Sequence, residues 1–80
     1  MDIDVHGMLR LEAKKYILET IDRCYKDRIT ILNVIHGSNN GTAIRSWLRG
    51  SKTLGDKVIE VTPHILQYSD VTTIKIKRRK

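Results

Sequence analysis

The chain has 80 residues, of which 40% are hydrophobic and 30% charged, and its formal net charge is +6. A chain of this length forms one domain with a modest core, which buries only roughly 60–65% of the surface that the unfolded form exposes. The composition excludes a membrane span, because no apolar run approaches ~20 residues, and the single cysteine, Cys24, excludes an internal disulfide. The opening Met-Asp-Ile-Asp lacks the basic and then apolar pattern of a signal peptide, so we expect a reducing, cytoplasmic setting.

The first half of the chain has the pattern of a strand, a helix and a second strand. Residues 2–6, DIDVH, alternate polar and apolar side chains with the period of a strand. From about residue 9 to residue 26, apolar side chains that end with Cys24 recur on one face of a helix, although no Ser, Asp or Asn stands at its N-cap. Residues 29–35, ITILNVI, form an apolar, β-branched run that is typical of a central strand buried on both faces.

The second half continues with one helix and two strands. After the loop HGSNN, residues 41–49 predict a short amphipathic helix. Residues 58–62, VIEVT, alternate as a strand, which would put Ile59 and Val61 on one face. Residues 71–77, VTTIKIK, predict the last strand.

This order of elements favours an α/β fold. Strand, helix and strand within about 35 residues indicate a βαβ unit with two parallel strands. We therefore predict a single β-α-β-α-β-β two-layer sandwich over residues 1–80, in which two helices pack on a four-stranded mixed sheet.

Each of the first two predicted strands ends in the dipeptide His-Gly. His6-Gly7 ends the first strand, and His36-Gly37 ends the second. If the two strands are parallel, both pairs lie at the carboxyl edge of the sheet, where open α/β sheets bind their ligands. Glycine at these places lets the backbone approach a ligand closely.

Asp4 stands two residues before His6, so both side chains project from the same face of the strand. A carboxylate beside an imidazole fixes the tautomer of the ring, which suits general acid–base work on a phosphodiester. The alternative is structural: Asp4 would hydrogen-bond the loop backbone, and His6 would only end the strand.

The residues before the second helix form a candidate anion site. Ser38, Asn39, Asn40 and Gly41 precede the helix, and helix N-termini present unpaired N–H groups that bind phosphate. Arg45 could add a charge-assisted contact. An ordinary turn with an asparagine cap remains the alternative.

The excess positive charge lies in the second half of the chain. Residues 1–40 hold six basic and six acidic side chains, whereas residues 41–80 hold nine and three. This asymmetry indicates a polyanionic partner such as nucleic acid. Lys75, Lys77 and the final Arg-Arg-Lys would contact phosphate groups without reading a base sequence. A solvated edge strand with protective lysines is the alternative.

Taken together, these segments resemble the Smr (small MutS-related) domain. The family's Leu-Asp-Leu-His-Gly signature appears as residues 3–7, and its His-Gly-x-Gly-x-Gly signature as residues 36–41, with Asn39 in place of the middle glycine. Residues 41–45, Gly-Thr-Ala-Ile-Arg, look like the family's Thr-Gly-x-Leu-Arg segment. Here Ile44-Arg45 stands for the Leu-Arg pair, one residue later than in the family pattern. The glycine-rich turn that the family has before its last strand is absent from residues 67–70.

The resemblance implies a sandwich similar to the C-terminal domain of translation initiation factor three. It also implies DNA or RNA binding and, in many members, endonuclease activity. Asp4 and His6 would then be the catalytic pair. The substrate loop and its phosphate contact would comprise His36, Gly37, Gly41 and Arg45.

We therefore predict an endonuclease that acts on RNA or on nicked or branched DNA. Cleavage of RNA needs no metal, because the ribose 2′-hydroxyl can attack, whereas a divalent metal could serve on DNA, where water attacks. No metal-ligand motif is present. Two alternatives remain open: a non-catalytic module that docks on nucleic acid or the ribosome, and a protein-interaction domain whose charge confers solubility. The chain could also be part of a longer protein.

Overall fold

The computed structural model describes residues 1–37, 42–50, 54–63 and 70–79. The elements follow one another as β1 (Asp2–Asp4), α1 (Arg10–Lys26), β2 (Ile31–Ile35), α2 (Thr42–Arg49), β3 (Val58–Pro63) and β4 (Val71–Ile76). The predicted order of strands and helices is therefore confirmed, with ends that differ by one or two residues.

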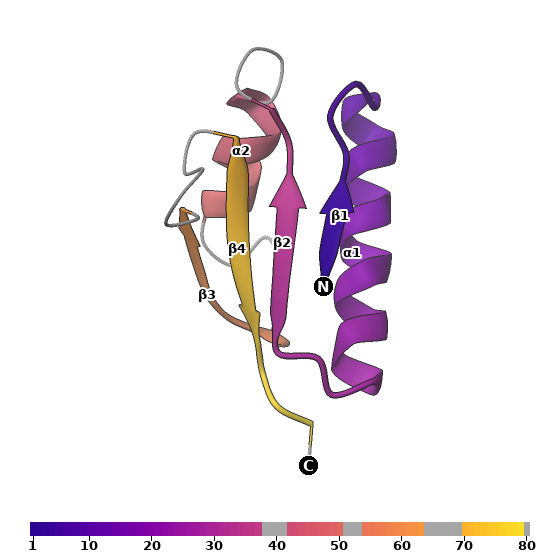
Figure 1. Cartoon of the computed structure of the whole chain (residues 1–80), viewed down its shortest axis with the longest axis vertical. Coiled ribbons are helices and arrows are strands. Elements are labelled where there is room, and N and C mark those ends of the chain that lie inside the picture. The colour runs from indigo at the N-terminus through magenta and orange to yellow at the C-terminus, as the bar shows by residue number, and fades with distance from the viewer. Residues whose placement is uncertain (38–41, 51–53, 64–69, 80) are drawn as a thin grey trace.

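The strands form one mixed sheet in the order β1-β2-β4-β3 (Figure 1). β1 and β2 are parallel, whereas β4 runs antiparallel to both β2 and β3. The helix α1 connects the parallel pair, since two parallel strands cannot be joined by a tight turn. The predicted α/β sandwich with a four-stranded mixed sheet is confirmed.

Both helices cover the same face of the sheet. One core cluster contains Ile17 of α1, Leu48 of α2 and Leu32 of β2. The two helices also contact each other: the Lys14 ammonium of α1 lies 5.4 Å from the centroid of the Trp47 ring of α2. This arrangement leaves the opposite face of the sheet without a helix.

The open face corrects the prediction that β2 is buried on both sides. Leu32 and Val34 are fully buried beneath the helices, but Ile31 is 41% exposed, and Asn33 and Ile35 are half-buried. The strand is central, as predicted. Its second face is uncovered because neither helix lies there.

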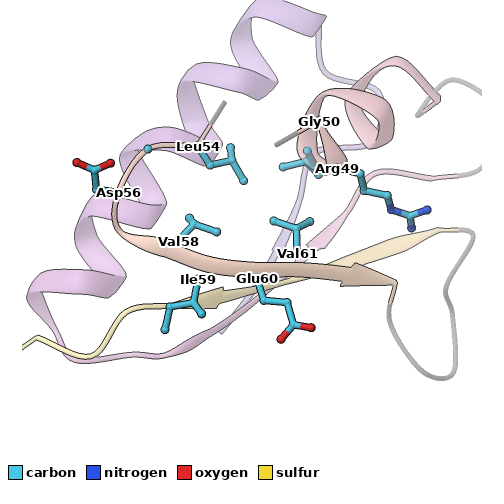
Figure 2. A pocket seen from close by; sticks show the side chains of 10 residues that line it. Arg49, Gly50, Leu54, Asp56, Val58, Ile59, Glu60 and Val61 are labelled. Atoms are coloured by element: carbon cyan, nitrogen blue, oxygen red, sulfur yellow. The ribbon is translucent and has the colours of Figure 1, made fainter. Parts of the chain in front are cut away.

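A bulge in β3 corrects a second prediction. The register shifts between Val58 and Glu60, and an extra residue at a bulge interrupts the alternation of the strand. As a result Val58 and Val61 point toward the helices, whereas Ile59 is 62% exposed and points away (Figure 2). Simple alternation had paired Ile59 with Val61.

The helix α1 depends on packing rather than on a cap. It begins after Leu9, whose side chain makes no cap hydrogen bond. Its buried stripe includes Cys24, as predicted, and burial raises the pKa of the Cys24 thiol. Within the described part of the chain, neither helix is long and apolar enough to cross a membrane.

Candidate functional site

The residues that directly follow β1 and β2 lie at the carboxyl edge of the two strands, at the top of Figure 1. Asp4 pairs with Ile35, and the Val5 N–H donates to the Ile35 carbonyl at 2.9 Å. A Cβ atom on Gly37 would lie 3.5 Å from the Cβ atom of His6. The two His-Gly pairs are therefore neighbours, as the parallel order predicted.

A tight turn after β1 presents His6 to solvent. The Met8 N–H donates to the Val5 carbonyl at 3.1 Å, and Gly7 has a φ of 80°. These features are typical of a type II turn, which favours glycine at its third position. The His6 side chain at the second position is 68% exposed.

The two glycines give a matched prediction. Gly7 and Gly37 have almost the same φ, 80° and 79°, and an alanine there costs about 1–2 kcal/mol of backbone strain. A Cβ on Gly7 would meet nothing within 4 Å, and one on Gly37 would make only an ordinary contact. We expect Gly7→Ala and Gly37→Ala to lower the free energy of unfolding by similar amounts, as urea titration would measure. A much larger loss for Gly37→Ala would show that a Cβ atom at Gly37 meets a closer neighbour than the Cβ atom of His6.

Asp4 and His6 form a hydrogen-bonded pair at this edge. Oδ1 of Asp4 lies 2.6 Å from Nδ1 of His6 and also accepts the His6 backbone N–H at 3.0 Å. An ionised carboxylate can only accept, so Nδ1 carries the hydrogen and Nε2 of the neutral ring keeps a lone pair. No described residue hydrogen-bonds Nε2. This nitrogen can therefore take a proton from a group bound at the edge.

The pair lowers the pKa of Asp4 below its ordinary value of 3.8, first through the hydrogen bond from the His6 side chain and then through the His6 backbone N–H. A carboxyl whose pKa is depressed on folding stabilises the fold above pH 3.8, and this contribution is lost as the pH falls through the lower value. Asp4 is thus ionised at neutral pH and remains a hydrogen-bond acceptor.

An NMR titration of the carboxyl groups can check this effect. We expect His6→Ala to raise the pKa of Asp4 toward 3.8, because both the ring and its hydrogen bond are gone. Asp22 is an internal control, since its pKa is lowered by a separate hydrogen bond from Lys57. An Asp4 midpoint that does not move in His6→Ala would contradict the pairing.

His36 has a different environment from His6, because its side chain is buried with only 2% exposure. Nδ1 lies 2.9 Å from the Gly37 carbonyl oxygen, which can only accept, so Nδ1 donates. Nε2 lies 2.8 Å from Oγ1 of Thr72 on β4, and Arg49 donates to the same oxygen at 3.5 Å. The ring therefore joins the loop after β2 to β4.

The predicted place of His36 in the substrate loop stays a prediction, and its burial bears on how the ring would serve there. A ring that is buried and bonded at both nitrogens cannot also contact a substrate without leaving these partners. The arrangement favours a positioning role, in which His36 holds the backbone of Gly37 beside His6.

The remaining predicted site residues lie outside the described part of the structure or away from the pair. Ser38, Asn39, Asn40 and Gly41 fall in the first group. Arg45 lies in α2, but its side chain is not among the described groups. The anion site at the start of α2 stays a prediction.

Lys75 and Lys77 are exposed but distant from the pair. On β4, Val71 pairs with Ile35 at the end of β2, whereas Lys75 pairs with Ile31 at its beginning. Four residues of strand separate the two levels, roughly 13 Å. These lysines do not join the Asp4–His6 site, and their contact with substrate stays a prediction.

The sequence reasoning missed three residues at this edge. Thr72 and Arg49 contact His36 or its partner, and the Asp70 carbonyl accepts the N–H groups of His36 and Gly37 at 2.9 and 3.1 Å. Oδ1 of Asp70 is buried and has no hydrogen-bond partner among the described residues. The strand order could have indicated Asp70 and Thr72. A last strand that pairs antiparallel with the second strand begins beside the end of that strand, where His36 lies.

Two other features lie apart from this edge. A pocket between the end of α2 and β3 is lined by Leu48, Leu54 and Val61 and contains no acid–base pair of this kind (Figure 2). Across residues 1–37, 42–50, 54–63 and 70–79, no three His, Cys, Asp or Glu side chains are grouped as metal ligands.

The comparisons with known proteins identify the family. The Smr domain model matches residues 3–72, which includes both His-Gly segments and all six elements as far as the start of β4. The chain belongs to the Smr domain family. Members of this family bind nucleic acid.

A solved structure gives the same fold. The chain is similar to the Smr domain of Thermus thermophilus MutS2, with a TM-score of 0.75 and 21% sequence identity over 95% of this chain and 96% of that one. At this identity the likeness concerns the fold alone. No curated protein matches the sequence.

Proposed function

We propose that this Smr domain is an endonuclease that cleaves phosphodiester bonds with Asp4 and His6. The observation that carries the proposal is the 2.6 Å contact between Asp4 Oδ1 and His6 Nδ1, in a pair whose side chains are 51% and 68% exposed. The contact leaves Nε2 facing solvent with a lone pair. Membership of a nucleic-acid-binding family supports a polynucleotide as the substrate.

On RNA the pair can act without further groups. His6 Nε2 removes the proton from a ribose 2′-hydroxyl, whose oxygen then attacks the adjacent phosphorus and displaces the 5′-oxygen of the next nucleotide. The leaving oxygen takes a proton from the imidazolium or from water. Asp4 keeps the ring oriented and stabilises its positive charge. A positioned acid–base group of this kind contributes about 10²–10⁴-fold to the rate.

On nicked or branched DNA the same pair would need a different nucleophile. A water molecule must attack, and a divalent metal ion is a common means of activating it. The proposal therefore includes a difference in chelator sensitivity: cleavage of RNA resists a chelator, whereas cleavage of DNA is reduced by it.

The experiment compares the purified 80-residue domain with Asp4→Ala/His6→Ala on end-labelled RNA and nicked DNA, with and without chelator. We expect wild type to cleave at least one substrate, the double variant to leave it intact, and both proteins to bind it equally. Equal product from the two proteins would indicate a contaminating nuclease and refute the catalytic assignment.

A non-catalytic nucleic-acid- or ribosome-docking module is the second candidate. It is favoured by one observation, since Lys75 and Lys77 are exposed at a level of the sheet away from Asp4 and His6. In this case no substrate is cleaved, binding weakens as salt rises, and binding is unchanged in Asp4→Ala/His6→Ala.

A further inference from the structure

The end of α1 and the residues after β4 lie together at the bottom of Figure 1, at the end of the molecule opposite the turn after β1. A second basic surface there combines the end of α1, the loop after it and the residues at and after the end of β4. We call it the basic pole, and its exposed members are Lys26, Arg28, Lys75, Lys77, Arg78 and Arg79.

Backbone contacts hold these two segments together. The Ile76 N–H donates to the Thr30 carbonyl at 2.7 Å, and the Arg79 guanidinium donates to the Lys26 carbonyl at 3.1 Å. Residues 76–79 thereby lie against the end of α1 and the loop after it. Cations that are more than forty positions apart in the sequence become one surface.

Acidic side chains do not cancel this charge. Three acids border the basic pole beside its six cations: Asp27, Asp56, which precedes the Lys57 carbonyl bonded by the Lys77 N–H, and Glu60, which pairs with Lys75 in the register of β3 and β4. The nearby Asp22 carboxylate is already bound by the Lys57 ammonium at 2.6 Å. The basic pole therefore keeps a net positive charge that would attract a polyanion.

Two structural explanations do not account for the whole surface. Lysines protect the exposed edges of sheets, but β4 lies between β2 and β3 and has no free edge. Cations also stabilise the last turn of a helix, and Arg79 does so at Lys26. Lys75 and Arg78 make no such contact with the described residues, so their charge is available to a ligand.

Along the sheet, the nearest cation of the basic pole, Lys75, lies roughly 13 Å from the level of the pair, and the length of α1 sets the distance to its far end. α1 begins four residues after His6 and ends at Lys26. Its 17 residues span ~25 Å at 1.5 Å per residue. One strand of duplex DNA covers this distance with about seven phosphates, at 3.4 Å each.

We propose that the basic pole is a second phosphate-backbone contact, which anchors the nucleic acid that flanks the segment bound at Asp4 and His6. This inference rests on the proposed function, because it requires a polynucleotide at the pair. A duplex that extends at least about seven base pairs from the pair reaches both surfaces. Once one surface has bound the duplex, the effective concentration of the duplex at the other surface is high, and this strengthens the overall binding.

The test is a set of binding titrations, followed by fluorescence anisotropy, with hairpin-closed DNA and RNA duplexes of about 5 and about 20 base pairs, lengths below and above this span. Wild type is compared with Lys75→Gln/Lys77→Gln/Arg78→Gln. The matched control, Lys75→Arg/Lys77→Arg/Arg78→Lys, keeps every charge. A longer duplex offers more binding positions to every protein, so the measured quantity is the long-to-short affinity ratio of each variant relative to wild type.

We expect the glutamine variant to lose about tenfold or more in the long-to-short ratio. Its salt dependence on the long duplex, the slope of log K against log salt, should fall by roughly 2–3, since each phosphate contact contributes about 0.9. The charge-conserving control should match wild type in both respects. Equal ratios for wild type and the glutamine variant would overturn the inference.

The failure of this inference can be told apart from failure of the proposed function. If wild type binds neither duplexes nor single strands of either length, nucleic-acid binding itself is wrong and both fail. If wild type cleaves RNA but all three proteins have the same ratio, the basic pole alone is refuted. A reduced ratio in the glutamine variant, together with loss of cleavage in Asp4→Ala/His6→Ala, would support both.

Discussion

Replacing His6 with alanine is expected to reduce the rate of nucleic-acid cleavage by about 10²–10⁴ and to lower the free energy of unfolding only slightly, because the pair that it breaks is exposed. The ring is 68% exposed, and it hydrogen-bonds Asp4, which is itself exposed. Removing it therefore buries no unpaired group and opens no cavity. Cleavage is measured under single-turnover conditions, and stability by urea titration of the same preparation.

Two further variants sharpen this prediction. Asp4→Asn keeps a carbonyl oxygen near Nδ1 but removes the negative charge, so its rate should fall between those of wild type and His6→Ala. Glu19→Ala, at an exposed position of α1, is the control and should cleave as wild type does. A stability loss in His6→Ala that parallels the activity loss would argue for a structural role.

In contrast to His6→Ala, His36→Ala is expected to lower the free energy of unfolding substantially, by about 2–4 kcal/mol. The substitution removes a buried ring, leaves the Gly37 carbonyl without its bond and leaves the Thr72 hydroxyl with Arg49 as its partner. Thr72→Val removes only the hydroxyl and keeps the shape of the side chain, so its cost should be about 1–3 kcal/mol, that of an unpaired buried nitrogen on His36.

The double variant His36→Ala/Thr72→Val tests whether these two groups act together. Each single change removes the same hydrogen bond, so the double variant should lose less than the sum of the two, by about 0.5–3 kcal/mol. Urea titrations of the four proteins measure this coupling. Strictly additive losses would mean that the 2.8 Å contact contributes nothing to stability.

The element order and the meeting of the two His-Gly pairs could be predicted because they follow from local patterns and one topological rule. Alternation in residues 2–6 and the apolar run in residues 29–35 predicted strands, and a βαβ unit makes such strands parallel. Their carboxyl ends then share one edge. The Asp-x-His spacing placed Asp4 and His6 on one face, and the 2.6 Å contact confirms that placement.

What could not be predicted depends on long-range packing. The burial of His36 depends on Thr72, which lies 36 positions away in the sequence. The second face of β2 is exposed because both helices pack on the same side of the sheet. The bulge in β3 depends on how that strand meets β4. None of these relations leaves a periodic trace in the chain.

The basic residues show the same limit. Their excess in the second half of the chain was evident from the sequence, but their location relative to the candidate site was not. The antiparallel course of β4 carries Lys75 and Lys77 away from Asp4 and His6 and toward the end of α1. A charge count therefore indicated the kind of partner without indicating which surface binds it.

Chemical rescue of a histidine-deleted variant tests the acid–base role of His6 most directly. In His6→Gly the missing ring leaves a solvent-accessible gap beside Asp4, since the native side chain is 68% exposed, and free imidazole can enter it. The account predicts that added imidazole restores RNA cleavage by His6→Gly in proportion to its concentration, with no increase for wild type or for Asp4→Ala/His6→Gly. Cleavage by His6→Gly at the wild-type rate without imidazole would contradict the account.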